Sequence, residues 1–216
     1  MARRRRVDRP DPIERGNRGA IVRAAAKAIA RSGVRGMRIE EVAADADVSP
    51  ALLYYHFDNR AGLVRAALEH ASELAPSTVL RERRADGNGY ERLEAALLRE
   101  LDDENEVREA AVVWGEVSAS AVFDPELRDA VRRVNEDWRG HVTDGIRAGV
   151  EDGSIRPGVD ADAVADTLIS LVDGLCTRCL AGALVRKRAV GLLRAALSRE
   201  LRPTAAADAK STRRRR

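Results

Sequence analysis

Apolar residues recur every three to four positions along most of the chain. One such stripe runs through Ile21, Ala25 and Ile29, and another includes Leu193 and Leu197. This spacing places the side chains on one face of an α-helix, whereas a strand alternates at every second residue. The strand formers Ile, Tyr and Thr are sparse, and Ala, Val and Leu supply most of the apolar content. The pattern therefore predicts an all-α fold.

Glycine, proline and capping residues divide this pattern into about nine helices. Gly33 is expected to end the first helix as a left-handed cap, and Asp47 is expected to adopt the left-handed conformation in a turn. Asp58 and Asp124 are expected to cap the fourth and seventh helices. The predicted helices span residues 13–32, 39–45, 49–57, 60–73, 90–101, 107–122, 125–150, 160–180 and 185–201.

Composition predicts four segments along the 216 residues. Residues 1–12 contain an arginine run and two prolines, and residues 203–216 are of low complexity and basic. Both tails are predicted to be disordered. Pro76 is expected to separate a first helical domain, residues 13–75, from a second, residues 76–202.

A helix-turn-helix pattern lies within residues 38–57. Ala43 is small enough for two helices to approach closely, and Val48 is apolar just after the turn. Ser49 is suited to cap the next helix, and Pro50 follows at the first helical position, where its missing N–H costs nothing. A short helix held in this way presents side chains to the major groove of DNA.

The charge distribution points to a polyanionic partner. Arg3–Arg6 and Arg213–Arg216 contribute eight positive charges, so removing them from the net charge of +3 leaves −5 for the remaining residues. Basic tails on an acidic chain are typical of proteins that bind polyanions. A merely solvated tail remains an equal alternative, and the tails alone do not identify a DNA-binding protein.

Residues 13–75 resemble the TetR family of bacterial transcriptional regulators. The resemblance is carried by Ile39, Val42–Ala43, Val48–Ser49 and the run Leu53–Phe57, followed by Arg60 and Leu63. It implies a three-helix DNA-binding domain that a fourth helix joins to a dimer-forming, ligand-binding body.

The expected DNA contacts come from the second and third helices and the start of the fourth. Arg38 replaces a hydroxyl residue common in the family, and Leu52 is unable to hydrogen-bond a base edge but is suited to touch a thymine methyl. Tyr54, Tyr55 and His56 are expected to bind phosphate oxygens. The predicted contact residues are Arg38, Ser49, Pro50, Ala51, Leu52, Tyr54, Tyr55, His56 and Arg60.

The second domain resembles the body of BetI-type members of the family. The similar features are a tryptophan and a glutamate on one helix, then Asp124–Leu127, then Leu171–Leu175. The resemblance implies that the last two helices pair with their copies in a homodimer. The helix at 160–180 is expected to be apolar on more than one face, which agrees with burial in both a core and an interface.

Five residues of this domain are candidates for a ligand pocket, because tryptophan faces and carboxylates together suit a cation. Core packing of the tryptophans and solvation of the acids are the alternative. The candidates are Trp114, Glu116, Trp138, His141 and Asp173.

Catalysis and metal binding have little support in the sequence. We find no pairing of a nucleophile with a base, no glycine-rich phosphate loop and no metal-ligand spacing, so no cofactor and no metal are expected. Cys176 and Cys179 are expected to be buried thiols that face an interface, with redox sensing as a minority alternative. Two cysteines and the lack of an apolar run of about 18 residues favour a cytoplasmic protein without a membrane span.

The predicted function is a ligand-responsive, sequence-specific transcriptional repressor that a small-molecule effector releases from its operator. The partners would be operator DNA, the effector and a second copy of the chain. A non-specific architectural DNA-binding protein and a small helical enzyme are the alternatives. The sequence leaves the effector, the operator and the sign of regulation open.

Overall fold

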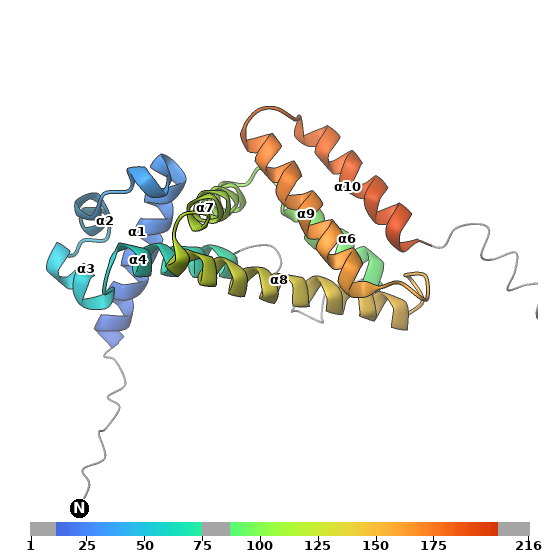
Figure 1. The fold of residues 1–216 in the computed structure, drawn as a ribbon, viewed down its shortest axis with the longest axis horizontal. Helices are drawn as coiled ribbons and strands as arrows, with labels where there is room; N and C mark the ends of the chain where they lie inside the picture. The colour runs from blue at the N-terminus through green and yellow to red at the C-terminus, as the bar shows by residue number, and fades with distance from the viewer. Residues whose placement is uncertain (1–11, 75–86, 203–216) are drawn as a thin grey trace, which may run out of the picture.

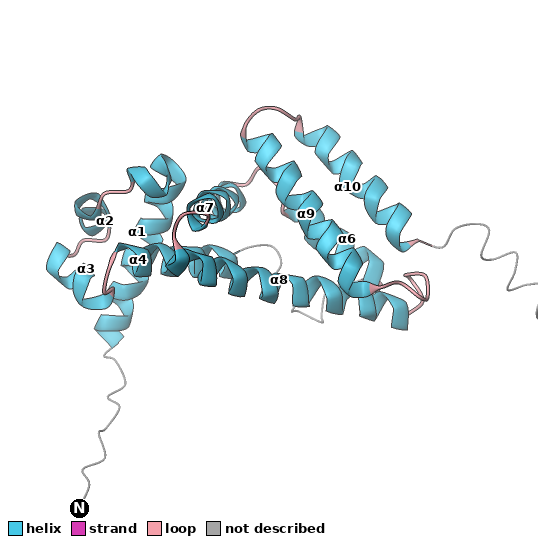
Figure 2. Ribbon diagram, in the orientation of Figure 1, coloured by secondary structure: helices cyan, strands magenta, loops and turns pink. Residues whose placement is uncertain are grey.

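The computed structural model describes residues 12–74 and 87–202, and all regular structure within these ranges is α-helical (Figures 1 and 2). The all-α prediction is confirmed, and no strand occurs in the described part. The predicted tails and the proposed boundary at Pro76 lie outside the described residues, except for residue 12. The helices are α1 (Pro12–Gly36), α2 (Ile39–Asp45), α3 (Pro50–His56), α4 (Arg60–Leu74), α6 (Gly89–Arg99), α7 (Asn105–Ala121), α8 (Pro125–Glu151), α9 (Ala161–Leu180) and α10 (Arg186–Leu201).

The molecule is elongated, with α1–α4 at one end and α9 and α10 at the other (Figure 1). α8 runs along its length and packs against α4 and α7 near its start and against α6 and α9 further along. Two separate hydrophobic cores result. The first core lies among α1–α4, α7 and the start of α8, and the second lies among α6, the later part of α8, α9 and α10.

The helix-turn-helix forms as its local sequence predicts. Asp47 has a φ of 55°, in the left-handed region that Asp tolerates better than most residues. The Ser49 hydroxyl accepts a hydrogen bond from the Leu52 N–H at 3.2 Å, and Pro50 occupies the first turn of α3. Val42 and Ala43 are buried in the first core, so α2 holds α3 against the rest of the domain.

Two helix ends differ from the prediction. Gly33 has a φ of 73° but a ψ of 169°, so it interrupts α1 without adopting the left-handed helical conformation, and a further turn follows to Gly36. The cap of α4 is Asn59, whose Oδ1 accepts from the Gly62 N–H at 2.7 Å. The prediction of Asp58 was wrong because the capping oxygen must belong to the residue directly before the helix.

In the C-terminal body, side-chain caps begin α6 and α8, and these two helices cross closely. Asn88 and Glu91 form a reciprocal capping box at the start of α6. α6 then crosses α8 at two glycines, since a Cβ added to Gly89 would lie 2.4 Å from the Gly149 Cα. Asp124 caps α8 as predicted, accepting from the Glu126 N–H at 2.9 Å.

α9 uses most of its large apolar side chains inside its own subunit. Val164, Leu168, Val172 and Leu175 are all buried in the second core. The exposed positions of α9 carry polar or small residues, among them Gly174. The expectation that this helix is apolar on more than one face was therefore wrong, because the apolar residues converge on one side.

Candidate DNA-binding and effector sites

The exposed side of α3 presents most of the predicted DNA contacts. Tyr54 and Tyr55 are 52% and 71% exposed, although both are large aromatic residues. Leu53 and Phe57 are buried in the first core, so the helix divides into an inner and an outer face. Among the other predicted contacts at the start of the helix, Leu52 is half-buried. The remaining three are exposed: Ser49, Pro50 and Ala51.

His56 is less accessible than its aromatic neighbours. Its side chain is half-buried, and its Nε2 atom is inaccessible and has no hydrogen-bond partner. The imidazole lies edge-on to the Tyr55 ring, with centroids 5.4 Å apart. Any phosphate contact by His56 would therefore have to come from an N–H at Nδ1.

The two predicted arginine contacts differ in their surroundings. Arg38 is exposed directly before α2, and its nearest acidic partner is Glu41 at 3.7 Å. The Arg60 guanidinium donates hydrogen bonds to the Val34 and Arg35 carbonyl oxygens at the end of α1. A cation is favourable at such unsatisfied carbonyls, so Arg60 ties α4 to α1 whether or not it also contacts DNA.

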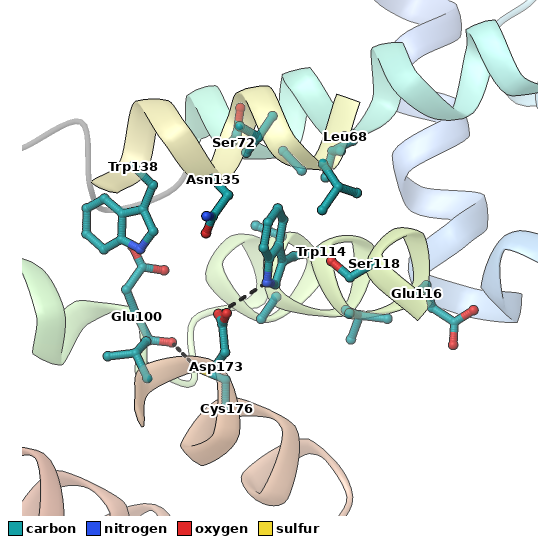
Figure 3. Close-up of a pocket in the computed structure, with 18 of the residues that line it drawn as sticks. Leu68, Ser72, Glu100, Trp114, Glu116, Ser118, Asn135, Trp138, Asp173 and Cys176 are labelled. Carbon is teal, nitrogen blue, oxygen red and sulfur yellow. Dashed lines mark hydrogen bonds between the residues drawn. The ribbon is translucent and has the colours of Figure 1, made fainter. Parts of the chain in front are cut away.

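A cavity of about 890 Å³ lies between the two cores, and all five predicted pocket residues line it. Its walls come from α4, α7, α8 and α9, together with Glu100 after α6. In Figure 3, Trp138, Glu100, Asp173 and Cys176 lie on one side of Trp114, and Leu68 and Ser118 lie on the other.

Trp114 and Asp173 form the polar centre of this cavity. The Trp114 Nε1–H donates a hydrogen bond to the Asp173 carboxylate at 3.1 Å (Figure 3). Burial raises the pKa of Asp173 to about 6, and the hydrogen bond from Trp114 offsets part of that rise. The carboxylate is therefore poorly solvated, and a cation in the cavity would stabilise its charged form.

Glu116 borders the cavity, but its carboxylate is directed away from the Trp114–Asp173 pair (Figure 3). Its Oε2 accepts a hydrogen bond from the Val34 N–H at 3.1 Å. Gly33 has a φ of 73°, which favours glycine, and a Cβ there would lie 2.6 Å from this oxygen and displace the Glu116 carboxylate. Glu116 thus links α7 to the end of α1 and is poorly placed to hold a ligand with Asp173.

The two thiols face the interior of their own subunit. Cys176 lines the cavity, and its Sγ lies 3.3 Å from the Glu100 carbonyl oxygen. Burial, together with the nearby Glu100 and Asp173 carboxylates, raises the pKa of Cys176 to about 12. Both cysteines are free, half-buried and packed against the second core, and their position at an interface stays a prediction. A thiol with so high a pKa is a poor redox sensor.

Several lining residues escaped sequence reasoning, including Leu68, Glu100, Ser118 and Asn135. Val131, Val134 and Trp138 follow the helical repeat along α8, but they are only half-buried because they border the cavity. The polar Asn135 and His141 on the same face were the available signal. No group of metal-ligating side chains occurs within the described ranges, and none of the described helices is long and apolar enough to cross a membrane.

Two family models match the chain. Residues 21–67 match the bacterial regulatory proteins of the tetR family, and residues 89–202 match the C-terminal domain of BetI-type transcriptional repressors. The HTH-type transcriptional regulator BetI of Rhizobium meliloti is 24% identical over 161 residues, which cover 74% of this chain and 76% of the relative.

Solved structures show the same relationship. A TetR-family transcriptional regulator from Rhodococcus sp. is 36% identical, with a TM-score of 0.80 over 87% of this chain and 99% of the other. A transcriptional regulator from Saccharomonospora viridis, solved in complex with choline, is 26% identical, with a TM-score of 0.76 over 87% and 98%. The chain belongs to the TetR family of bacterial transcriptional regulators, with a C-terminal domain of the BetI repressor type, and is not an enzyme.

Proposed function

We propose that this regulator is a homodimeric repressor whose effector is a small organic cation bound beside Asp173. The observation that carries the proposal is the carboxylate of Asp173, which lies in a cavity with two tryptophans and is oriented by Trp114 at 3.1 Å. A carboxylate and aromatic faces together stabilise a quaternary ammonium group. The relative from Saccharomonospora viridis that was solved with choline supports this choice of ligand class.

In this proposal residues 13–75 bind DNA and residues 76–202 bind the effector and the second subunit. Tyr54 and Tyr55 are directed to phosphates, and the first turn of α3 lies nearest the bases. Direct base readout there is weak, since Ala51 and Leu52 offer only apolar contacts. Shape and deformability of the operator would then supply part of the specificity.

Dimerisation is assigned to the exposed faces of α9 and α10. Gly174 of α9 and Gly191 of α10 are both exposed, with open space where a Cβ would lie. Leu192 adds an apolar side chain that is 43% exposed. Small residues around an exposed leucine allow two helix pairs to approach closely, and a two-fold axis would then place two α3 helices about 34 Å apart, one DNA turn.

Release follows if the effector prefers the conformer with the wrong α3 spacing. A ligand changes an equilibrium only through its different affinities for the two conformers. The cavity wall includes Leu68 of α4 and Trp114 of α7, and both helices pack against α1. A change in the cavity therefore reaches the DNA-binding helices through α4 and α7.

The test begins with DNA from the region upstream of the protein's own gene. Nuclease protection in competition with random DNA is expected to reveal one near-palindromic site. Choline or tetramethylammonium is then expected to release that DNA from the wild-type protein. Asp173→Asn should keep the protection and lose the response, whereas Asp137→Asn, an exposed acid at the same cavity, should respond like the wild type.

Two results would reject the proposal. One is protection no stronger than on random DNA, which would indicate a non-specific protein. The other is a response to the cation that Asp173→Asn retains in full, which would place the effector elsewhere.

A further inference from the structure

The cavity has two chemically different ends, because its walls belong to two different cores. Trp138, Val172 and Cys176 pack with the second core, and Asp173 and Glu100 lie beside them. Leu68, Ala71, Ala110, Val131 and Val134 pack with the first core. Trp114 lies between the two groups, with its N–H directed to Asp173 (Figure 3). The acidic end and the apolar end are thus parts of one space.

The size of this space exceeds what a small ammonium headgroup fills. The volume of about 890 Å³ is near the top of the range of roughly 300–1,000 Å³ that holds drug-sized ligands. A headgroup beside Asp173 would leave the apolar end empty. An apolar ligand group bound against these walls would contribute a favourable binding free energy, roughly proportional to the apolar area that it removes from water.

The charged groups near the apolar end set the orientation of such a ligand. Arg128 and Arg132 line the cavity there, and their positive charge disfavours a cation. Arg132 pairs with Asp129 at 3.0 Å, which offsets its charge, whereas Arg128 donates to the Val122 carbonyl oxygen at 3.4 Å and keeps its positive charge. The cationic group is therefore directed to Asp173, and the rest of the ligand extends toward α4.

On the basis of the proposed function, we propose that the effector is an amphiphilic cation: an ammonium headgroup bound at Asp173 that carries an apolar chain of several carbons. The chain lies between Val131 of α8 and Leu68 and Ala71 of α4. The headgroup alone occupies the acidic end without touching α4. Only the alkyl chain of the ligand contacts α4. The first residue of α4, Arg60, donates hydrogen bonds to the end of α1. Chain length then governs both affinity and release of DNA.

The experiment titrates the full-length protein with tetramethylammonium and with butyl-, hexyl- and octyltrimethylammonium, below their micelle concentrations, by calorimetry. Affinity is expected to rise about two- to fourfold per methylene while the chain fills the apolar end. 1-Octanol is expected to bind at least tenfold more weakly than octyltrimethylammonium. Octanol binding as tightly as the cation would overturn the proposal, because the headgroup would then be irrelevant.

Val131→Phe fills the apolar end of the cavity and therefore tests the position of the alkyl chain more specifically. It is expected to weaken octyltrimethylammonium at least tenfold and to leave tetramethylammonium within twofold. Val122→Phe makes the same change at a valine that is 65% exposed and outside the cavity, and it should alter neither ligand. Ala110→Leu, which adds bulk from α7, replaces Val131→Phe if that variant does not fold by circular dichroism.

The outcomes separate this inference from the proposed function. If tetramethylammonium binds and the longer chains add nothing, the amphiphilic ligand is wrong and the cation site stands. If no member of the series binds, the cation site itself is wrong. An unchanged octyltrimethylammonium affinity in the folded variant, Val131→Phe or its replacement Ala110→Leu, would also overturn the placement of the alkyl chain.

Discussion

Asp173 carries its negative charge where water solvates it poorly. Its pKa of about 6 lies above the ordinary value of 3.8, so the folded protein holds the proton more tightly than the unfolded chain does. The folded state therefore loses stability as the pH rises from about 4 to about 6, and that loss remains at higher pH. This cost of holding a charge in the cavity is what a carboxylate retained for ligand binding would show.

Replacing Asp173 with Asn should increase stability near neutral pH. The amide keeps an oxygen for the Trp114 N–H and carries no charge, so the free energy of unfolding at pH 8 is expected to rise by on the order of 2 kcal/mol. Below pH 4 the two proteins should be nearly equal. Urea unfolding at both pH values measures this difference, and a variant less stable than the wild type at pH 8 would contradict it.

The same residue sets the pH dependence of cation binding. Protonation of Asp173 competes with the cation, so tetramethylammonium affinity is expected to be full above about pH 7 and to fall as the pH drops through 6. Glu100, Asp137 and His141 also line the cavity, so the difference between wild type and Asp173→Asn isolates this carboxylate. A pH profile that is identical in the variant would assign the effect to another group.

Tyr54 tests the predicted DNA contact at the level of one hydroxyl. Tyr54→Phe is expected to weaken binding to the protected site and to its single-base variants by the same factor, about three- to tenfold, because a phosphate contact carries no sequence information. Fluorescence anisotropy on a set of substituted sites measures it. The residue is 52% exposed, so the melting temperature should not change. A change in base preference would instead place Tyr54 at a base edge.

At the scale of elements, the end of α1 is held from two sides. Arg60 of α4 donates to carbonyls of Val34 and Arg35, and Glu116 of α7 accepts from the Val34 N–H. The carbonyl and amide groups freed by the interruption at Gly33 are thus bound by side chains from two of the helices that line the cavity, α4 and α7. α1 leads directly into α2. Through Glu116 of α7, the C-terminal body is therefore hydrogen-bonded to the segment that precedes the helix-turn-helix.

Glu116 variants test this junction. Glu116→Ala is expected to lower the free energy of unfolding by about 1–2 kcal/mol, since it removes a charged acceptor, and Glu116→Gln by less because the amide oxygen still accepts. Glu109→Ala, on the same helix and without a partner in the described structure, is the matched control. Equal losses in Glu116→Ala and Glu109→Ala in urea unfolding would show that the junction adds nothing.

At the scale of the whole molecule, dimerisation decides whether two α3 helices act together. Gly174→Leu adds bulk to the exposed face of α9 and is expected to weaken the dimer at least tenfold by sedimentation at micromolar concentrations. Gly140→Leu is the matched control, because Gly140 is also an exposed helical glycine with open space where a Cβ would lie. Dissociation in both variants, or in neither, would contradict the assignment of the dimer to α9.

The helices and most of their caps depend on interactions between residues close in the sequence, so they can be predicted from the sequence alone. Ser49, Asp124 and Asp160 each cap a helix through their own side chains, so nearest-neighbour chemistry is enough. The same rules failed by one residue at Asn59, where two capping residues are adjacent. The five pocket candidates were found by residue type, and their common cavity follows from packing.

The sequence by itself determined the all-α fold, the helix-turn-helix and the outward position of Tyr54 and Tyr55, because helical periodicity and capping act within a few residues. Only the tertiary structure decided that Glu116 is turned away from the cavity, that Arg60 is bound to the end of α1, and that an apolar region adjoins Asp173. These features join residues tens of positions apart. Such contacts depend on how whole helices cross, which periodicity within a single helix does not encode.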